Sequence, residues 1–131
     1  MTTKPRVIAL EEHYWDAEVS SHFNSPEARV PSLKKRLDDV GELRIREMDE
    51  AGIDVQVLSH GAPATQRMDA ATAVPLARGA NDRLQETCRA HPGRFEGFAV
   101  LPTAEDREKI LNGNARRLLR MQLRTALSPA A

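Results

Sequence analysis

The sequence contains little of what several classes of protein depend on. Its single cysteine, Cys88, has no partner, so no disulfide can form within the chain and a reducing compartment is expected. The 19 basic and 19 acidic side chains cancel, so no overall field attracts nucleic acid or a membrane surface. The apolar run at positions 7–10 is too short for a signal-peptide core, and no stretch could span a bilayer. These absences predict a cytoplasmic protein without nucleic-acid or membrane partners.

Motifs of several common enzyme classes are missing as well. The sequence has no Gly-rich phosphate loop, no CxxC pair and no Ser-His-Asp set. Cys88 falls in a helical pattern with nothing nearby to lower its pKa, so we expect a small buried residue and not a nucleophile. These patterns assign no catalytic residue.

Glu11 and His13 form the most informative motif. They follow the apolar run and stand two positions apart, so on a strand their side chains point to one face while Glu12 points to the other. A carboxylate oxygen and an imidazole nitrogen suit a divalent transition metal such as zinc. The alternative is that both are ordinary polar residues where a strand ends, since Glu-x-His pairs arise often by chance. Two ligands make only half of a metal site.

The chain alternates predicted strands and helices, which is typical of a parallel α/β sheet with crossover helices. Strands are predicted at 6–11, 55–59 and 95–101. Between the first two strands, Leu33, Leu37 and Val40 recur at helical spacing until Gly41. A second helical stretch ends at Gly52, which suits a left-handed C-terminal cap.

The next helix is predicted to begin with Thr72 as its N-cap. Pro75 then falls in the first turn, where its missing N–H breaks no intrahelical bond, whereas a start at Asp69 would place it in the helix interior. Its expected apolar stripe comprises Ala73, Leu76, Ala77, Ala80, Leu84 and Cys88.

Two further helices are predicted at the C-terminal end, one capped by Thr103 and one by Asn114. In the last helix Leu118, Leu119 and Leu123 could pack inward while the arginines stay in solvent. A basic surface for membranes or nucleic acid is the alternative. The lack of interleaved aromatics, and the attraction of cations to a helix C-terminus, favour the simpler interpretation.

Four parts of the sequence carry a resemblance to a known family. They are VIALEEHYW at 7–15, MDEAGIDVQVLS at 48–59, ANDRL at 80–84 with HPGRF at 91–95, and DREKI at 106–110 with GNA at 113–115. In this order they resemble the opening strand, the first crossover helix and second strand, the next helix and third-strand entry, and the C-terminal end of the amidohydrolase-related metal-dependent family. That family includes the resorcylate, dihydroxybenzoate and aminocarboxymuconate semialdehyde decarboxylases. The resemblance implies a (β/α)8 TIM barrel.

The length fits only part of such a barrel, which needs about 250 residues, whereas this chain has 131. We expect a partial barrel of about three parallel strands with crossover helices at 1–102 and a C-terminal helical tail at 103–131, with an internal stretch missing near Leu101-Pro102. The family's remaining metal ligands, a central-strand histidine and a late-strand aspartate, have no counterpart here. Unpaired strand edges and an uncovered apolar face predict self-association.

The resemblance implies a metal-dependent decarboxylase of hydroxylated aromatic or related small-molecule carboxylates. Glu11 and His13 would bind a divalent metal, zinc by preference and manganese as the alternative. A hydrolase of the same family, in which metal-bound water attacks a carbonyl or imine, is a second interpretation. A non-catalytic remnant acting as an interaction module is a third, and a gene fragment without a selected role is a fourth. With two ligands missing, we expect the short chain to be inactive or barely active.

His60 is the remaining candidate site residue. It follows the second predicted strand and should lie at the same rim as Glu11 and His13, where barrel enzymes collect their site residues. We therefore name it as a candidate substrate-binding residue that could also assist the metal. A solvent-facing loop histidine is the alternative, and His22 and His91 are weaker candidates.

Overall fold

The computed structural model describes residues 4–102, and the helices and tail predicted at 103–131 lie outside the described residues. No helix in the described part has both the length and the apolar character needed to cross a membrane. Its elements are β1 (Ile8–Tyr14), α1 (Ala17–Ser20), the 3-10 helix η1 (Pro26–Arg29), α2 (Pro31–Asp38), α3 (Glu42–Ala51), β2 (Val55–His60), α4 (Ala70–Ala90) and β3 (Phe95–Gly97).

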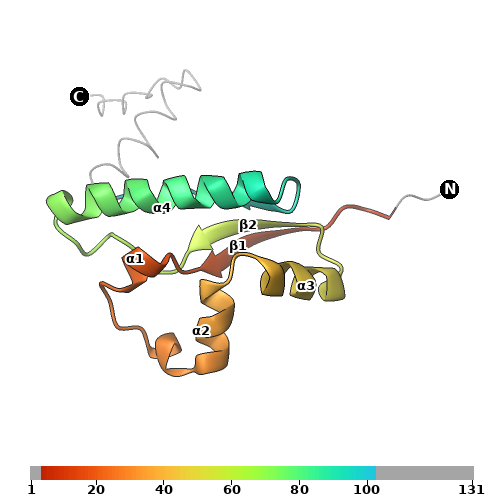
Figure 1. The fold of residues 1–131 in the computed structure, drawn as a ribbon, viewed down its shortest axis with the longest axis horizontal. Helices are drawn as coiled ribbons and strands as arrows, with labels where there is room; N and C mark the ends of the chain where they lie inside the picture. Colours follow the sequence, from red (N-terminus) through yellow and green to blue (C-terminus); the bar gives the residue numbers. More distant parts are fainter. Residues whose placement is uncertain (1–3, 103–131) are drawn as a thin grey trace, which may run out of the picture.

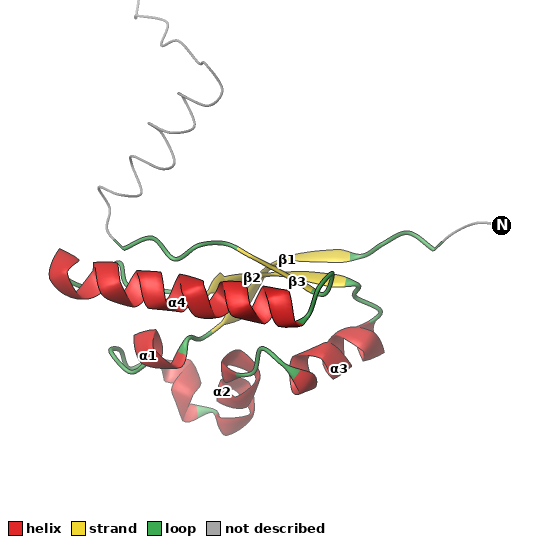
Figure 2. Cartoon of the chain, turned by 45° about the horizontal axis from the view of Figure 1, so that its top comes forward, coloured by secondary structure: helices red, strands yellow, loops and turns green. Residues whose placement is uncertain are grey.

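The three strands form one parallel sheet in the order β1-β2-β3 (Figure 2). Helices α2 and α3 belong to the first crossover and α4 to the second, and Figure 1 shows α4 lying along the strands. This confirms the predicted α/β class with parallel strands and crossover helices. Strands β1 and β3 are the edges of the described sheet.

Strand β1 carries a bulge at the candidate metal ligands. Pairing with β2 is regular up to Ala9 and resumes at Glu12, so that Leu10 and Glu11 both lie opposite Val57. Glu11 has a φ of 56°, a left-handed conformation that is costly for a residue with a Cβ. Bulges bend a strand and change where its side chains point. The simple strand alternation assumed from the sequence therefore does not hold at Leu10 and Glu11.

One face of the sheet packs against both α3 and α4. Their shared core consists of Tyr14, Met48, Leu58, Leu84 and Phe95. Helix α4 comes so close to β3 that a Cβ added at Gly97 would lie 2.5 Å from Cδ2 of Leu84. Glycine at this position lets the helix rest directly on the strand.

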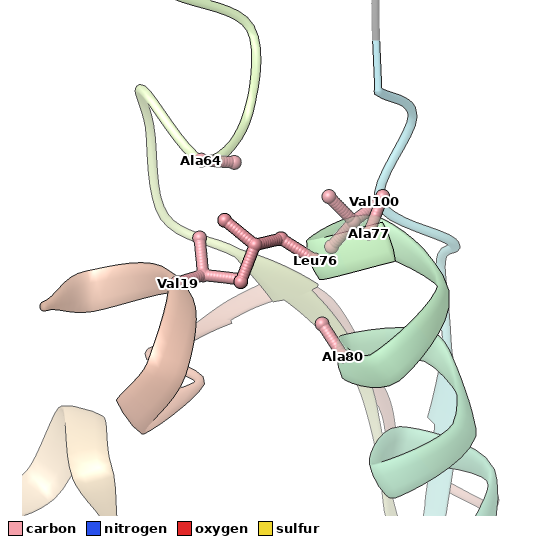
Figure 3. Close-up of a cluster of buried hydrophobic side chains, with 6 residues drawn as sticks. All are labelled: Val19, Ala64, Leu76, Ala77, Ala80 and Val100. Atoms are coloured by element: carbon pink, nitrogen blue, oxygen red, sulfur yellow. The ribbon is translucent and has the colours of Figure 1, made fainter. Parts of the chain in front are cut away.

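A second cluster joins α1, the loop after β2, α4 and the segment after β3 (Figure 3). It comprises Val19, Ala64, Leu76, Ala77, Ala80 and Val100. Five of the six residues in the predicted stripe of α4 are buried, which confirms that face of the helix, and Cys88 is half-buried. The cluster fixes the N-terminal half of α4 near the carboxyl ends of the strands.

The opposite face of the sheet is not covered by the described residues. Phe98 follows the end of β3, and its N–H donates to the Leu58 carbonyl at 2.8 Å. The side chains of Ile8, Leu10 and Phe98 are 53%, 66% and 51% exposed. An apolar sheet face of this kind is normally buried by further structure.

The predicted start of the third long helix was wrong. Helix α4 begins after Asp69, whose carboxylate accepts a hydrogen bond from the N–H of Thr72 at 3.0 Å and one from its hydroxyl at 2.9 Å. This cap sets the start three residues earlier than predicted. Pro75 consequently lies inside the helix, where it provides no N–H to the Ala71 carbonyl.

The strand boundaries also differ from the prediction. Strand β1 is shifted to Ile8–Tyr14, which places Glu11 and His13 inside the strand, and β3 ends at Gly97, well before residue 101. Strand β2 matches the prediction with His60 added. The segment between β1 and α2 contains α1 and η1, and Gly52 caps α3 with a φ of 71°, as predicted.

Candidate metal site and its surroundings

His13 is held by its neighbour across the sheet. His13 and Ser59 are partners in register, and His13 Nδ1 lies 3.1 Å from Ser59 Oγ. This contact leaves Nε2 of the exposed ring available for a metal, since a ligating histidine commonly uses its other nitrogen for an orienting hydrogen bond. Glu12, the next residue back, lines a groove beside α2 and α3, and His13 contributes to the same lining.

Glu11 is exposed on β1, two residues before His13, and is one of two non-glycine residues in the described part with a positive φ, the other being Ala64. Strain of this kind persists where the surrounding structure enforces it, and it is concentrated at functional sites. Here the bulge brings Leu10 and Glu11 together opposite one residue of β2. Glu11 is thus an exposed residue at the bulge, with a left-handed backbone conformation.

The donor types fit a divalent metal, but their number does not. Glu11 and His13 supply one oxygen and one nitrogen, whereas protein zinc sites have three or four protein ligands. Within residues 4–102, no group of three or more His, Cys, Asp or Glu residues could hold a metal ion. Glu11 and His13 alone are therefore too few to complete a metal site within the described residues.

His60 uses both ring nitrogens within the chain. Its Nε2 accepts a hydrogen bond from the Asp16 N–H at 3.1 Å, and Nδ1 lies 2.7 Å from the Gly61 carbonyl oxygen, to which it donates. The rings of Tyr14 and Phe23 pack edge-on against it. Burial lowers the pKa of His60, despite the opposing effects of the Gly61 hydrogen bond and the Asp16 charge. The ring therefore packs neutral at the end of β2 and does not point freely into solvent.

Asp16 and Arg83 lock α1 to α4 at the same end of the sheet. Arg83 Nε and Nη2 donate to the two oxygens of Asp16 at 2.6 and 2.9 Å, and Asp16 Oδ1 also caps α1 through the Val19 N–H. Burial alone would raise the pKa of Asp16, yet these hydrogen bonds lower it. Sequence reasoning missed this pair because its members are 67 residues apart.

Arg44 is the least predictable residue near the site. Its guanidinium is buried and donates to the main-chain oxygens of His13, Arg36 and Asp39 and to Oε1 of Gln56, at 2.8–3.2 Å. Burial lowers its pKa. A lone arginine in a helical pattern gave no sequence signal for this role.

No protein-family profile matches the sequence. The chain is 45% identical over 98 residues to a γ-resorcylate decarboxylase of Polaromonas sp. and 41% identical over 101 residues to one of Rhodococcus jostii. Each match covers 72% of this chain but only 30% of the relative, so the chain spans about a third of the length of the curated relatives it matches.

Solved structures give the same result. A 2,6-dihydroxybenzoate decarboxylase bound to 2,6-dihydroxybenzoate superposes with a TM-score of 0.69 at 34% identity, covering 89% of this chain and 36% of that chain. A manganese-bound 5-carboxyvanillate decarboxylase of Novosphingobium aromaticivorans gives a TM-score of 0.70 at 28% identity, covering 86% and 38%. The described sheet and helices thus correspond to part of the TIM barrel of metal-dependent decarboxylases. Over this part, the chain is a homologue of the γ-resorcylate and 5-carboxyvanillate decarboxylases of the amidohydrolase-related family.

Proposed function

We propose that this chain carries two metal ligands, Glu11 and His13, of a decarboxylase acting on hydroxylated aromatic carboxylates. The observation that carries the proposal is the bulged β1, which presents both residues within a segment homologous to such decarboxylases. The chain's substrate, by this proposal, is a small aromatic carboxylate with an adjacent hydroxyl. A location in the cytoplasm remains a prediction from composition.

The proposed metal is divalent. Two of the similar solved structures, the N. aromaticivorans enzyme and a dihydroxybenzoate decarboxylase of Polaromonas sp., contain manganese. The Glu11 and His13 donors also suit zinc, which was preferred from the sequence, but no comparison favours zinc over manganese. A bound metal would supply positive charge to hold the substrate's carboxylate and neighbouring hydroxyl oxygen. No described residue is assigned as the proton donor to the ring carbon.

The two donors alone predict weak metal binding and little or no turnover. Loss of a positioned proton donor typically costs a factor of about 10² to 10⁴ in rate, and an incomplete site also fails to orient the substrate. We therefore propose that the 131-residue chain is inactive or barely active by itself. Of the alternative interpretations, the exposed apolar face of the sheet supports an interaction module that associates with other copies.

Metal content tests the ligand assignment directly. The protein is loaded with manganese or zinc, dialysed mildly and analysed for bound metal, beside Glu11→Gln with His13→Asn and a Glu12→Gln control on the opposite face. We expect metal in the wild type and in the control and its loss in the double variant. Equal metal in all three proteins would refute the assignment.

A separate assay tests the predicted lack of activity. The loaded protein is incubated with a panel of hydroxybenzoates, and carbon dioxide release is followed. Turnover by the wild type would contradict the predicted inactivity. If that turnover disappears in the Glu11 and His13 variants, it would at the same time support the proposed metal ligands. The same assay includes His60→Asn, which tests the candidate substrate contact of His60. The wild-type ring could make that contact only by breaking two hydrogen bonds.

A further inference from the structure

An apolar groove lies beside β1 and the helices of the first crossover. It has a volume of about 700 Å³ and is bounded by β1, α2 and α3. Its apolar lining includes Trp15, Leu33, Leu37, Leu43 and Ile53. Leu33 is 38% exposed although it occupies the predicted packing face of α2. Within the described residues, Leu33 is thus exposed, and Leu37 and Leu43 are only half-buried.

Carboxylates accompany this apolar surface. Glu12, Glu27 and Glu47 line the groove, and of these Glu47 pairs with Arg36 at 2.9 Å. The other lining cation, Arg44, is bonded to four oxygens within the chain and also interacts with the charge of Glu12, whereas Glu27 has no cation beside it among the lining residues. A segment that combines leucines with cations would match this lining.

The rest of the chain has that composition. Residues 4–102 contain 16 carboxylates and 13 Lys or Arg, whereas residues 103–131 contain three carboxylates and six Lys or Arg. All four cations after residue 110 are arginines, interleaved with Leu118, Leu119 and Leu123, and no carboxylate follows residue 108. The two parts of the chain carry opposite net charge.

The groove is within reach of this segment. Thr65 Oγ1 donates to the main-chain oxygen of Leu101 at 3.2 Å, and Ala62, three residues before Thr65, lines the groove. Thirteen residues separate position 102 from Arg116, and an extended chain of that length spans roughly 40 Å. Connectivity therefore allows intramolecular contact.

We propose that residues 116–124 of this chain occupy the groove between β1, α2 and α3. The leucines of the segment lie against Leu33 and Leu37, and its arginines face Glu12 and Glu27. This inference does not depend on the proposed metal site or on decarboxylase activity.

Disulfide trapping in the full-length chain tests the proposal. Cys88→Ser removes the only native thiol, and Leu33→Cys is then combined with Leu119→Cys. The matched control pairs Leu119→Cys with Val74→Cys, an equally exposed site on α4 outside the groove. We expect an intramolecular disulfide with Leu33→Cys to form at least about tenfold faster than with the control. Equal rates would overturn the proposal, and a crosslink mainly between chains would identify a second copy as the occupant.

Charge exchange provides a test without cysteines. Reversal of Arg116 and Arg120 to Glu should expose the groove and increase quenching of the sole tryptophan, Trp15, by acrylamide. Adding Glu12→Lys and Glu27→Lys should reverse that increase if the charges face each other. Quenching that is unchanged by the first reversal, or additive changes in the combined variant, would count against the segment as occupant. Circular dichroism checks that every variant remains folded.

Discussion

Arg44 Nη2 donates a hydrogen bond of 2.9 Å to the main-chain oxygen of His13. Strand β1 is an edge of the described sheet, so this oxygen would otherwise lack a partner within the described part of the chain. The same guanidinium also holds the carbonyls of Arg36 and Asp39. One side chain of α3 therefore fixes the end of α2 and the strand that carries the proposed ligands.

Replacing Arg44 with Met should destabilise the protein by roughly 3 kcal/mol, because several buried acceptors lose their donor. Arg44→Lys should also destabilise it, since an ammonium cannot reproduce the planar geometry of the guanidinium. Urea unfolding measures the change, with exposed Arg46→Met in the same helix as control. A loss no larger than that of the control would show that the Arg44 network contributes little.

Tyr14→Phe should raise stability by roughly 1 kcal/mol. Tyr14 Oη is the one buried side-chain polar atom in the described part without a hydrogen-bond partner, and leaving such a group unpaired costs about 1–3 kcal/mol. Burial, followed by the Asp16 charge, raises the pKa of Tyr14 to about 12. Thermal and urea unfolding of the two proteins provide the measurement. A destabilised variant would indicate that the hydroxyl has an unrecognised partner.

Gly97→Ala should destabilise the protein by about 1–3 kcal/mol through overpacking. The new methyl group would collide with Leu84, whose Cδ2 lies 2.5 Å from the Cβ position. Leu84→Val should recover part of this loss of stability when it is combined with Gly97→Ala. In the wild-type background, Leu84→Val should not raise stability. Simple additivity of the two changes would contradict direct contact.

Acidification should weaken the fold through His60. Burial lowers its pKa below the 6.5 of a free histidine, so the unfolded chain binds this proton more readily than the folded chain. The contribution of His60 to the free energy of unfolding is therefore fully present above pH 6.5. It is lost as the pH falls from 6.5 to the pKa of His60 in the folded protein. His60→Asn should flatten the stability profile in this interval relative to wild type, whereas exposed His22→Gln should not. An unchanged slope would contradict a depressed pKa.

The open face of the sheet should mediate self-association. Ile8→Thr with Leu10→Thr and Phe98→Ser should shift oligomers toward monomer, because the exposed apolar area that drives association is reduced. Val74→Thr, which changes an exposed apolar residue on α4, is the control. Light scattering coupled to size exclusion reads the mass. A sharp monomer peak for the wild type across a wide concentration range would contradict the prediction.

Local sequence signals predicted much of the fold. The apolar period in α4 identified its buried face, and Gly52 marked the end of α3 because only a left-handed residue fits that cap. Strand β2 was placed well because it is a short apolar run between clear breaks. These features depend on neighbours within a few residues, which the sequence displays directly.

Features that depend on distant residues could not be predicted in this way. The start of α4 was missed for a local reason, since the Asp69 cap outweighed the cost of Pro75 inside the helix, a balance that propensity alone does not give. The bulge in β1 arises from pairing with β2, and the two bonds of His60 depend on Asp16 and Gly61 being brought to its ring. The Glu11 and His13 motif was recognisable as a candidate, but its strained backbone was not.

The free edges of β1 and β3 restrict how this sheet could be closed into a barrel. Because β2 is already paired on both sides, any added strand must join at an outer edge, and closure requires a series of strands that begins beside β3 and returns beside β1. A separate polypeptide supplying that series would meet both edges at once. The described fold is thus suited to fragment complementation, in which neither piece alone encloses the barrel interior.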